Sequence, residues 1–388
     1  MSFYEDLPQF HHEAQQAFES CSAERKGFND FGGDEYQLGL EVLANSLDAS
    51  EDLNPLTAQI MQANIIDVLQ SRLSSQYFLS KNPSCLDTEI QRPIFIIGMP
   101  RSGTTALHRL LVEDDCNQGL EYWLGVRPQP RPDKKEWSSY LDFRQCDEKL
   151  EIMRQAAPQL KDIHDMAADQ ADECRLLLMQ SFMNVTFQST AWVSDYEKWL
   201  LKADFSAAYR RYKMNLKLIS NGDSRRWVLK DPSHLWAPEA LLSTFPDACI
   251  IQMHRDPCKL IPSVASLVYT TRQIVEPDID KHRIGRRELA QWSSLLSNLD
   301  LFRSNYSSSS IYDVSMDELQ QDPEAVIKGI YEHFSLDHQR NNFDAEIRKM
   351  VSNFRRDNLQ NQNSHSYTPE EFGLTDEVIR KSFFYGKQ

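Results

Sequence analysis

Cysteine, positive charge and long apolar runs are all scarce in this 388-residue sequence. The 7 cysteines are scattered and form no CxxC pair, which disfavours a disulfide framework and a cysteine-based metal site. No stretch reaches the ~18 consecutive apolar residues of a membrane helix. The N-terminal stretch MSFYEDLPQFHHEAQQAF lacks the basic start and apolar run of a secretory signal. We therefore expect a cytoplasmic protein with no integral membrane segment.

Acidic residues outnumber basic ones by 57 to 42, which gives a formal net charge of -15. A general nucleic-acid binder needs a basic face, so we expect no nucleic-acid partner. A small anionic ligand is still compatible with this charge, because it needs only a few cations that converge in one pocket. The length and the 41% hydrophobic content allow a large buried core. The oligomeric state is left open by the sequence.

The order of apolar patterns along the chain predicts an α/β protein. Residues 1–90 read as helices joined by polar loops, and we expect an N-terminal helical extension followed by the main domain at 91–388. Short apolar runs typical of buried parallel strands lie at 93–98, 227–230 and 248–254, and a later strand followed by a helix is expected to start at 311–316. Helical patterns follow these runs, so we expect three layers, with a central parallel sheet flanked by helices.

The most informative stretch is GMPRSGTT at 98–105, between the first predicted strand and a predicted helix. Glycines allow a tight turn whose N–H groups face one concavity, and the helix start favours an anion. This arrangement predicts a P-loop-like phosphate site. A nucleotide kinase or hydrolase would carry lysine directly after Gly103, but Thr104 stands there and the loop cation is Arg101.

At PRSGTT the sequence resembles the sulfotransferases that use 3′-phosphoadenosine 5′-phosphosulfate (PAPS), and in particular the branch with bacterial and tyrosylprotein sulfotransferases. The resemblance runs from about 93 to 335. It implies a loop for the 5′-phosphosulfate formed by Pro100, Arg101, Ser102, Gly103, Thr104 and Thr105. A second motif, HRDP at 254–257 followed by a serine, implies that Arg255 and Ser263 bind the 3′-phosphate. An arginine fork and a hydroxyl donor suit that group.

The resemblance also implies catalytic residues for transfer of a sulfuryl group from PAPS to an acceptor hydroxyl. Arg101 and Lys230, the latter in the family-like segment LKDPSH at 229–234, are expected to stabilise developing negative charge. Glu121 is the first choice for the base that takes the acceptor's proton, at the spacing where tyrosylprotein sulfotransferases carry their catalytic glutamate. His234 is the second choice and His164 the third. No metal is expected, because lysine and arginine replace it.

The acceptor and two competing functions stay open at this point. A small or lipid-like alcohol, a phenol, a sugar and a peptide tyrosine all carry a suitable hydroxyl. The aromatic-rich segment 120–210 favours an acceptor with apolar surface. The alternatives to a sulfotransferase are a P-loop nucleotide kinase or hydrolase and a non-catalytic nucleotide-binding protein. The first predicts binding of ATP with magnesium, and the second predicts nucleotide binding without turnover.

Overall fold

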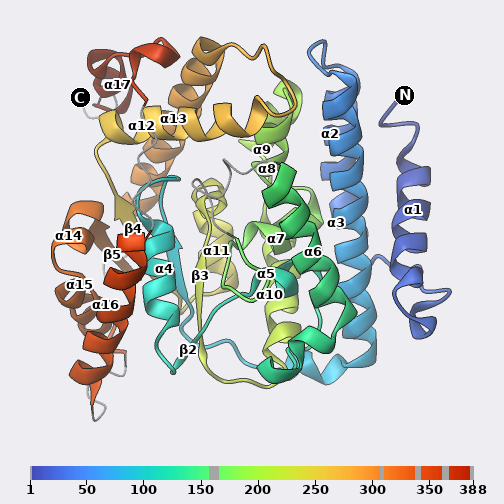
Figure 1. Cartoon of the computed structure of the whole chain (residues 1–388), viewed down its shortest axis with the longest axis horizontal. Helices are drawn as coiled ribbons and strands as arrows, with labels where there is room; N and C mark the ends of the chain where they lie inside the picture. Colours follow the sequence, from blue (N-terminus) through green and yellow to red (C-terminus); the bar gives the residue numbers. More distant parts are fainter. Residues whose placement is uncertain (1, 157–165, 306–309, 337–341, 361–366, 385–388) are drawn as a thin grey trace. The chain divides into compact units, whose positions relative to one another are not determined.

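The computed structural model describes residues 2–156, 166–305, 310–336, 342–360 and 367–384. The chain forms two compact units. Figure 1 shows its helices and strands. The first, here called the helical unit, comprises Met1–Ile90, Leu120–Ser224 and Ile274–Pro277. The second, the sheet unit, comprises Gln91–Gly119, Arg225–Gln273 and Asp278–Gln388. The division predicted at residue 90, between an N-terminal helical extension and the main domain, stays a prediction.

A five-stranded parallel sheet forms the centre of the sheet unit, in the order β2-β3-β1-β4-β5. The strands are β1 (Ile94–Ile97), β2 (Asn117–Gln118), β3 (Arg226–Lys230), β4 (Cys249–His254) and β5 (Ile311–Ser315). The predicted parallel sheet is confirmed, and only the two-residue strand β2 was not expected. Because all pairs are parallel, the carboxyl ends of the strands meet at one edge, where ligands of open α/β sheets bind.

Helices and short 3-10 turns follow the strands of the sheet unit. They are α4 (Thr104–Val112), η7 (Pro232–Trp236), α11 (Pro238–Thr244), α12 (Pro257–Arg272), α13 (Lys281–Ser304), α14 (Met316–Gln321), α15 (Pro323–His333), α16 (Phe343–Gln360), η9 (Glu370–Phe372) and α17 (Asp376–Phe384). Local signals explain where several begin. Asp256 and Asp322 each accept an N–H bond from the first turn of the following helix, and each is followed by proline. Ser315 and Glu318 form a capping box at α14.

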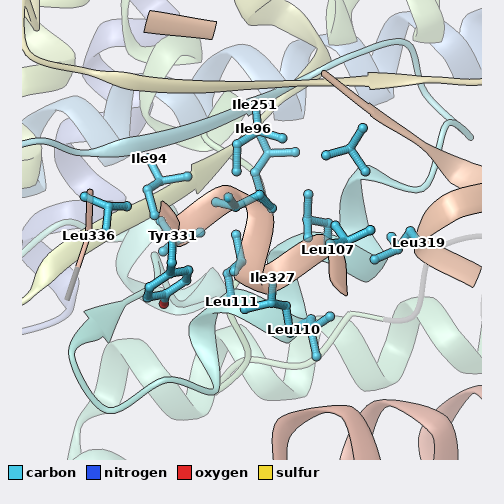
Figure 2. Close-up of a cluster of buried hydrophobic side chains, with 14 of the residues drawn as sticks. Ile94, Ile96, Leu107, Leu110, Leu111, Ile251, Leu319, Ile327, Tyr331 and Leu336 are labelled. Carbon is cyan, nitrogen blue, oxygen red and sulfur yellow. The ribbon is translucent and has the colours of Figure 1, made fainter. Parts of the chain in front are cut away.

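The alternation of side chains along β1 joins the layers of the sheet unit. Figure 2 shows the cluster on one face, where Ile94 and Ile96 meet side chains of α4 and α15. Phe95 points to the other face. The centroid of its ring lies 5.1 Å from that of His234 and 5.2 Å from that of Phe245. Burying one such aliphatic or aromatic side chain stabilises the fold by about 1.5–3 kcal/mol. The apolar run at β1 is therefore accounted for by burial on both faces.

The helical unit contains no strand among its described residues except the isolated bridge between Glu121 and Ala171. Its elements are α1 (Leu7–Ser20), η1 (Ala23–Arg25), η2 (Asp34–Tyr36), α2 (Gln37–Asp48), α3 (Pro55–Lys81), η3 (Pro83–Asp87), α5 (Tyr122–Val126), η4 (Lys134–Ser139), α6 (Leu141–Ala156), α7 (Arg175–Leu178), η6 (Met179–Ser181), α8 (Thr186–Thr190), α9 (Ser194–Leu200) and α10 (Ser206–Ser220). The helices predicted for the first 90 residues are thus confirmed. The proline-rich stretch 127–133 is an extended loop, as three prolines require.

The long helix α3 is fixed by a buried arginine. Arg72 is fully buried and donates to the carbonyl oxygens of Phe31, Gly33 and Gln180 and to the carboxylate of Glu35. These acceptors satisfy a charge that would otherwise be costly to bury. The contacts hold the segment before α2 against α3.

No described helix is both long enough and apolar enough to cross a membrane.

Candidate active site

The predicted phosphate loop connects β1 to α4 in the sheet unit. Gly98 and Gly103 have positive φ angles of 151° and 92°, and Arg101 also lies in the left-handed region with φ 70°. A Cβ atom at Gly98 would lie 3.0 Å from the carbonyl oxygen of Met253, so the close approach to β4 requires glycine. The buried Ser102 closes the turn, since its Oγ donates to the carbonyl oxygen of Met99 at 2.7 Å.

The loop ends at the N-terminus of α4, which has the properties of an anion site. The first N–H groups of a helix have no acceptor within the helix, and the dipole places partial positive charge there. The first backbone bond of α4 runs from the N–H of Leu107 to the carbonyl oxygen of Gly103. The earlier N–H groups, at residues 103 to 106, are therefore available to oxygen atoms of a phosphate or sulfate.

Lys230 brings a cation to this helix start from the neighbouring strand. It is the last residue of β3 and is paired in register with Ile96 of β1. The residue is only 1% exposed, and its Nζ donates to Oγ1 of Thr105 at 3.2 Å. The parallel register therefore sets an ammonium group beside the first turn of α4. The sequence predicts that Lys230 stabilises negative charge in the transition state, and this role stays a prediction.

Arg101, Arg255 and Ser263 lie together on the other side of the loop. Arg255 directly follows β4, and its Nη1 donates to the carbonyl oxygen of Arg101 at 2.7 Å. The Nε of Arg101 donates to Oγ of Ser263 at 3.3 Å. Ser263 is buried on α12, whose first turn is capped by Asp256. Two distant motifs that the sequence assigned to opposite ends of one ligand thus contact each other.

The charge of Arg101 is electrostatically costly in this setting. The residue is exposed over part of its surface, but desolvation is the largest cause that lowers its pKa. The charge of Arg255 lowers the pKa further, whereas Tyr367 acts in the opposite direction. An anion beside the two guanidinium groups would be attracted by both and would reduce their mutual repulsion.

His234 is held inside the sheet unit, within η7. Its residue surface is 0% exposed, and its ring meets Phe95 edge-on with an interplanar angle of 87°. Burial lowers its pKa to about 3, because the interior disfavours the charged imidazolium. A group with this pKa binds a proton weakly at neutral pH. The packing therefore favours a structural role for His234 over that of a base.

Glu121 lies in the helical unit, directly before α5. Its Oε2 atom lies 3.1 Å from Nε and 3.0 Å from Nη2 of Arg131, a residue of the proline-rich loop. The side chain of Glu121 is 16% exposed and that of Arg131 is 8% exposed. The carboxylate is thus held in one orientation and remains partly open to solvent. His164, the third candidate base, lies outside the described residues.

Sequence reasoning gave no role to a charged cluster beside Arg255. Asp313 on β5 accepts two bonds of 2.7 Å from the guanidinium of Arg303 on α13. The same carboxylate lies 2.6 Å from Nε2 of His254, the last residue of β4. The HRDP motif marked His254, but no local pattern marks Arg303. Within the described ranges, no three acidic, histidine or cysteine side chains are arranged to hold a metal ion.

A model of the sulfotransferase family matches residues 93–340, which include the whole glycine loop and Arg101, Lys230 and Arg255. A parallel α/β sheet with a glycine loop at its carboxyl edge is a setting in which phosphate-bearing ligands bind. The family match identifies the group that is transferred. The chain belongs to the sulfotransferase family and is a transferase.

Relatives and solved structures agree with this assignment. The chain is 25% identical over 295 residues to the omega-hydroxy-beta-dihydromenaquinone-9 sulfotransferase Stf3 of Mycobacterium bovis, and equally to that of Mycobacterium tuberculosis. The match covers 74% of this chain and 72% of theirs. The crystal structure of sulfotransferase STF1 from Mycobacterium tuberculosis H37Rv is 34% identical, with a TM-score of 0.85 over 97% of this chain and 98% of that one.

A second solved structure shares the fold. Sulfotransferase STF9 from Mycobacterium avium is 24% identical and superposes with a TM-score of 0.80, over 96% of this chain and 95% of that one. Both superpositions extend well beyond the residues matched by the family model.

Proposed function

We propose that this sulfotransferase takes the sulfuryl group from PAPS and passes it to a hydroxyl group of a lipid-like acceptor. The observation that carries the proposal is the grouping of three cationic side chains, Arg101, Lys230 and Arg255, around one glycine loop in the sheet unit. A donor with anionic groups at two ends matches such a grouping. ATP would need the lysine that the loop lacks after Gly103.

The residues present fit both charged ends of PAPS. The N–H groups at the start of α4, with Ser102, Gly103, Thr104 and Thr105, and the ammonium of Lys230 suit the 5′-phosphosulfate. The guanidinium of Arg255 and the buried hydroxyl of Ser263 suit the 3′-phosphate. Pro100 restricts the turn between these elements. All of these residues belong to one compact unit.

In the proposed step a new bond forms between the acceptor oxygen and sulfur while the bond from sulfur to the 5′-phosphate oxygen breaks. The products are a sulfate ester and 3′-phosphoadenosine 5′-phosphate, and the acceptor proton passes to a base. Negative charge increases on the departing phosphate oxygen, where Lys230 and the helix N–H groups would stabilise it. Neither a metal nor a covalent intermediate is needed for this balance.

Glu121 is the proposed base. A carboxylate that Arg131 holds in a fixed orientation, and that solvent still reaches, can accept a proton without first rotating. His234 is a weaker candidate because it is fully buried and has a pKa of about 3. The proposal for Glu121 rests on these side-chain contacts and on the resemblance to tyrosylprotein sulfotransferases.

The acceptor class is proposed from the relatives. The two mycobacterial enzymes named above are sulfotransferases of an omega-hydroxy-beta-dihydromenaquinone. The aromatic-rich residues 120–210 of this chain are consistent with a large apolar acceptor. We therefore propose an acceptor whose hydroxyl terminates or borders an apolar chain, rather than a sugar or a peptide tyrosine.

The test is transfer of radiolabelled sulfate from PAPS to a panel of acceptors, run with the wild type, Arg255→Ala and a matched control, Arg348→Ala, which alters an exposed arginine of α16. We expect labelled product with long-chain and isoprenoid alcohols, none from Arg255→Ala at the same donor concentration, and full activity in the control. Binding of 3′-phosphoadenosine 5′-phosphate without any labelled product would support a non-catalytic protein. Stabilisation by ATP with magnesium but not by this nucleotide would support a kinase or hydrolase.

A further inference from the structure

Arg131 lies between two carboxylates of the helical unit. Its Nε and Nη2 lie 3.1 and 3.0 Å from Oε2 of Glu121, while its Nη1 lies 3.8 Å from Oδ2 of Asp223. The two carboxylates therefore contact different edges of one guanidinium group. One positive charge shared by two carboxylates leaves a net negative charge on these three groups, which suits a side chain that has to accept a proton.

The turn after α10 holds Arg131 by its main chain as well as by its side chain. The N–H of Arg131 donates to the carbonyl oxygen of Ile219 at 3.2 Å, and Nδ2 of Asn221 donates to the carbonyl oxygen of Arg131 at 3.4 Å. Asn221 and Gly222 have positive φ angles of 48° and 85°, so the chain turns tightly here and brings Asp223 to the same arginine. One short turn thus contacts both the backbone and the guanidinium of Arg131.

The proline-rich loop is also anchored at the residues before Arg131. Nη2 of Arg127 lies 2.6 Å from Oδ1 of Asp67 on α3. Nε2 of Gln129 donates to Oδ2 of Asp142 on α6 at 3.1 Å. Prolines alternate with these polar residues and restrict the backbone angles between them. The side chain of Arg131 therefore extends from a loop that is fixed along its length.

We propose that Arg131 is a positioning residue for the reaction, which holds the carboxylate of Glu121 where the acceptor's proton is taken, and that Asp223 keeps the guanidinium turned toward this contact. The inference rests on the proposed function, in which Glu121 is the base. A glutamate side chain has several rotamers, and a base that must first find the productive one reacts less often. Neither Arg131 nor Asp223 has to touch the nucleotide or the acceptor in this arrangement.

The test is a double-mutant cycle on kcat, measured by transfer of radiolabelled sulfate from PAPS to the isoprenoid alcohols of the panel above. The proteins are the wild type, Glu121→Gln, Arg131→Gln, the double variant and the control Arg210→Gln, at an exposed position of α10. We expect Arg131→Gln to lower kcat by about 10- to 100-fold, as misplacement of a reacting group does, with the KM for PAPS within about threefold of the wild type. In the Glu121→Gln background the same substitution should change kcat by less than about twofold, because the arginine acts only through the carboxylate.

Two milder variants keep the test decisive if Arg131→Gln is unstable. Arg131→Lys restores a positive charge without the planar fork, so its kcat should lie between those of the wild type and Arg131→Gln. Asp223→Asn leaves the arginine in place and should lower kcat by a smaller factor than Arg131→Gln, again with the KM for PAPS unchanged. Thermal unfolding of each protein shows which of them are folded at the assay temperature.

Each outcome decides a different point. If the double variant loses the product of the two single effects, the inference is overturned, because Arg131 then acts independently of Glu121. A raised KM for PAPS with an unchanged kcat in Arg131→Gln would overturn it as well, since the arginine would then serve donor binding. Full turnover by Glu121→Gln would remove the base and the positioning role together and leave the sulfotransferase activity standing. If the wild type transfers no label to any acceptor, the proposed function fails instead.

Discussion

Arg131 holds Glu121 through two nitrogen atoms that lie 3.1 and 3.0 Å from the same carboxylate oxygen. The arginine belongs to an extended loop whose backbone is fixed in turn, since the N–H of Arg131 donates to the carbonyl oxygen of Ile219 at 3.2 Å. The carboxylate is therefore oriented by a loop that cannot become helical, because its prolines prevent it. Orientation of this kind is what a base needs before the acceptor arrives.

Replacing the proposed base should abolish most turnover while nucleotide binding is retained. Glu121→Gln keeps the shape of the side chain but cannot take a proton, so we expect kcat to fall by about 10²- to 10⁴-fold. The KM for PAPS and the affinity for 3′-phosphoadenosine 5′-phosphate should stay within about threefold of the wild type. Glu136→Gln, at an exposed position of η4, is the matched control. Full turnover by Glu121→Gln would refute the assignment.

Removing the cation at the start of α4 should affect the chemical step more than binding. Lys230→Met keeps the apolar stem and deletes the ammonium beside Thr105, so developing charge on the 5′-phosphate loses a stabilising partner. We expect kcat to fall by about 10²- to 10³-fold, by analogy with the loss of one preorganised donor. The control is Lys259→Met, at an exposed position of α12. A change confined to KM would show that Lys230 acts only in binding.

The buried histidine should make the folded state sensitive to acid. The pKa of His234 is about 3 in the folded protein against an ordinary 6.5, so only the unfolded chain gains a proton between these values. Stability is therefore retained above pH 6.5 and declines as the pH falls toward 3, by up to about 1.4 kcal/mol per pH unit from this group. Urea unfolding of the wild type and His234→Gln over this range tests the slope. If the free energies of unfolding of the wild type and of His234→Gln change with pH in parallel, His234 does not gain a proton on unfolding.

The cluster at the end of β4 and β5 should contribute stability that depends on an ionised carboxylate. The bonds from Arg303 are the largest cause that lowers the pKa of Asp313 to about 2, and His254 contributes in the same direction. Since the folded pKa lies below the ordinary 3.8, the contribution is full above that value and is lost as the pH falls through 2. Asp313→Asn should cost about 0.5–1 kcal/mol at pH 7, because the pair is half exposed.

The measurement for Asp313 is the difference in unfolding free energy between the two proteins at several pH values. The difference should narrow as the pH is lowered below 4. Asp317→Asn, which alters a carboxylate in the first turn of α14, serves as the control for removing one negative charge. A difference that is constant with pH would mean that the pairing of Asp313 with Arg303 contributes nothing through its charge.

The parts of the fold that the sequence could predict are those encoded locally. β1, β3 and β4 contain short apolar runs that are buried, and the glycine loop and the helix after it are adjacent in the chain. In β5 the buried Ile311 and Val314 alternate with more exposed residues. Strand β2 has two polar residues, Asn117 and Gln118, and its pairing with β3 comes from tertiary contacts, so no local pattern marks it. Such overrides of local preference are expected in short strands.

Contacts between distant residues account for what the sequence could not show at the site. The bond from Arg101 to Ser263 spans 162 positions, and the backbone of Arg101 lies in the left-handed region, with φ 70°. Arg303 on α13 pairs with Asp313 on β5, a contact between two different elements that no local pattern marks. The roles of the site residues, the cytoplasmic location and the division at residue 90 stay predictions.

The bond from Arg255 to the carbonyl oxygen of Arg101 ties a strand end to the main chain of the glycine turn. Under the proposed function, a substitution at position 255 therefore removes the contact with the 3′-phosphate and also breaks the bond to the main chain of the glycine turn. We therefore expect Arg255→Ala to lose more nucleotide affinity than removal of one phosphate contact would cost. A lysine at this position has a single nitrogen and cannot bond both the phosphate and the carbonyl oxygen of Arg101 as the arginine fork can.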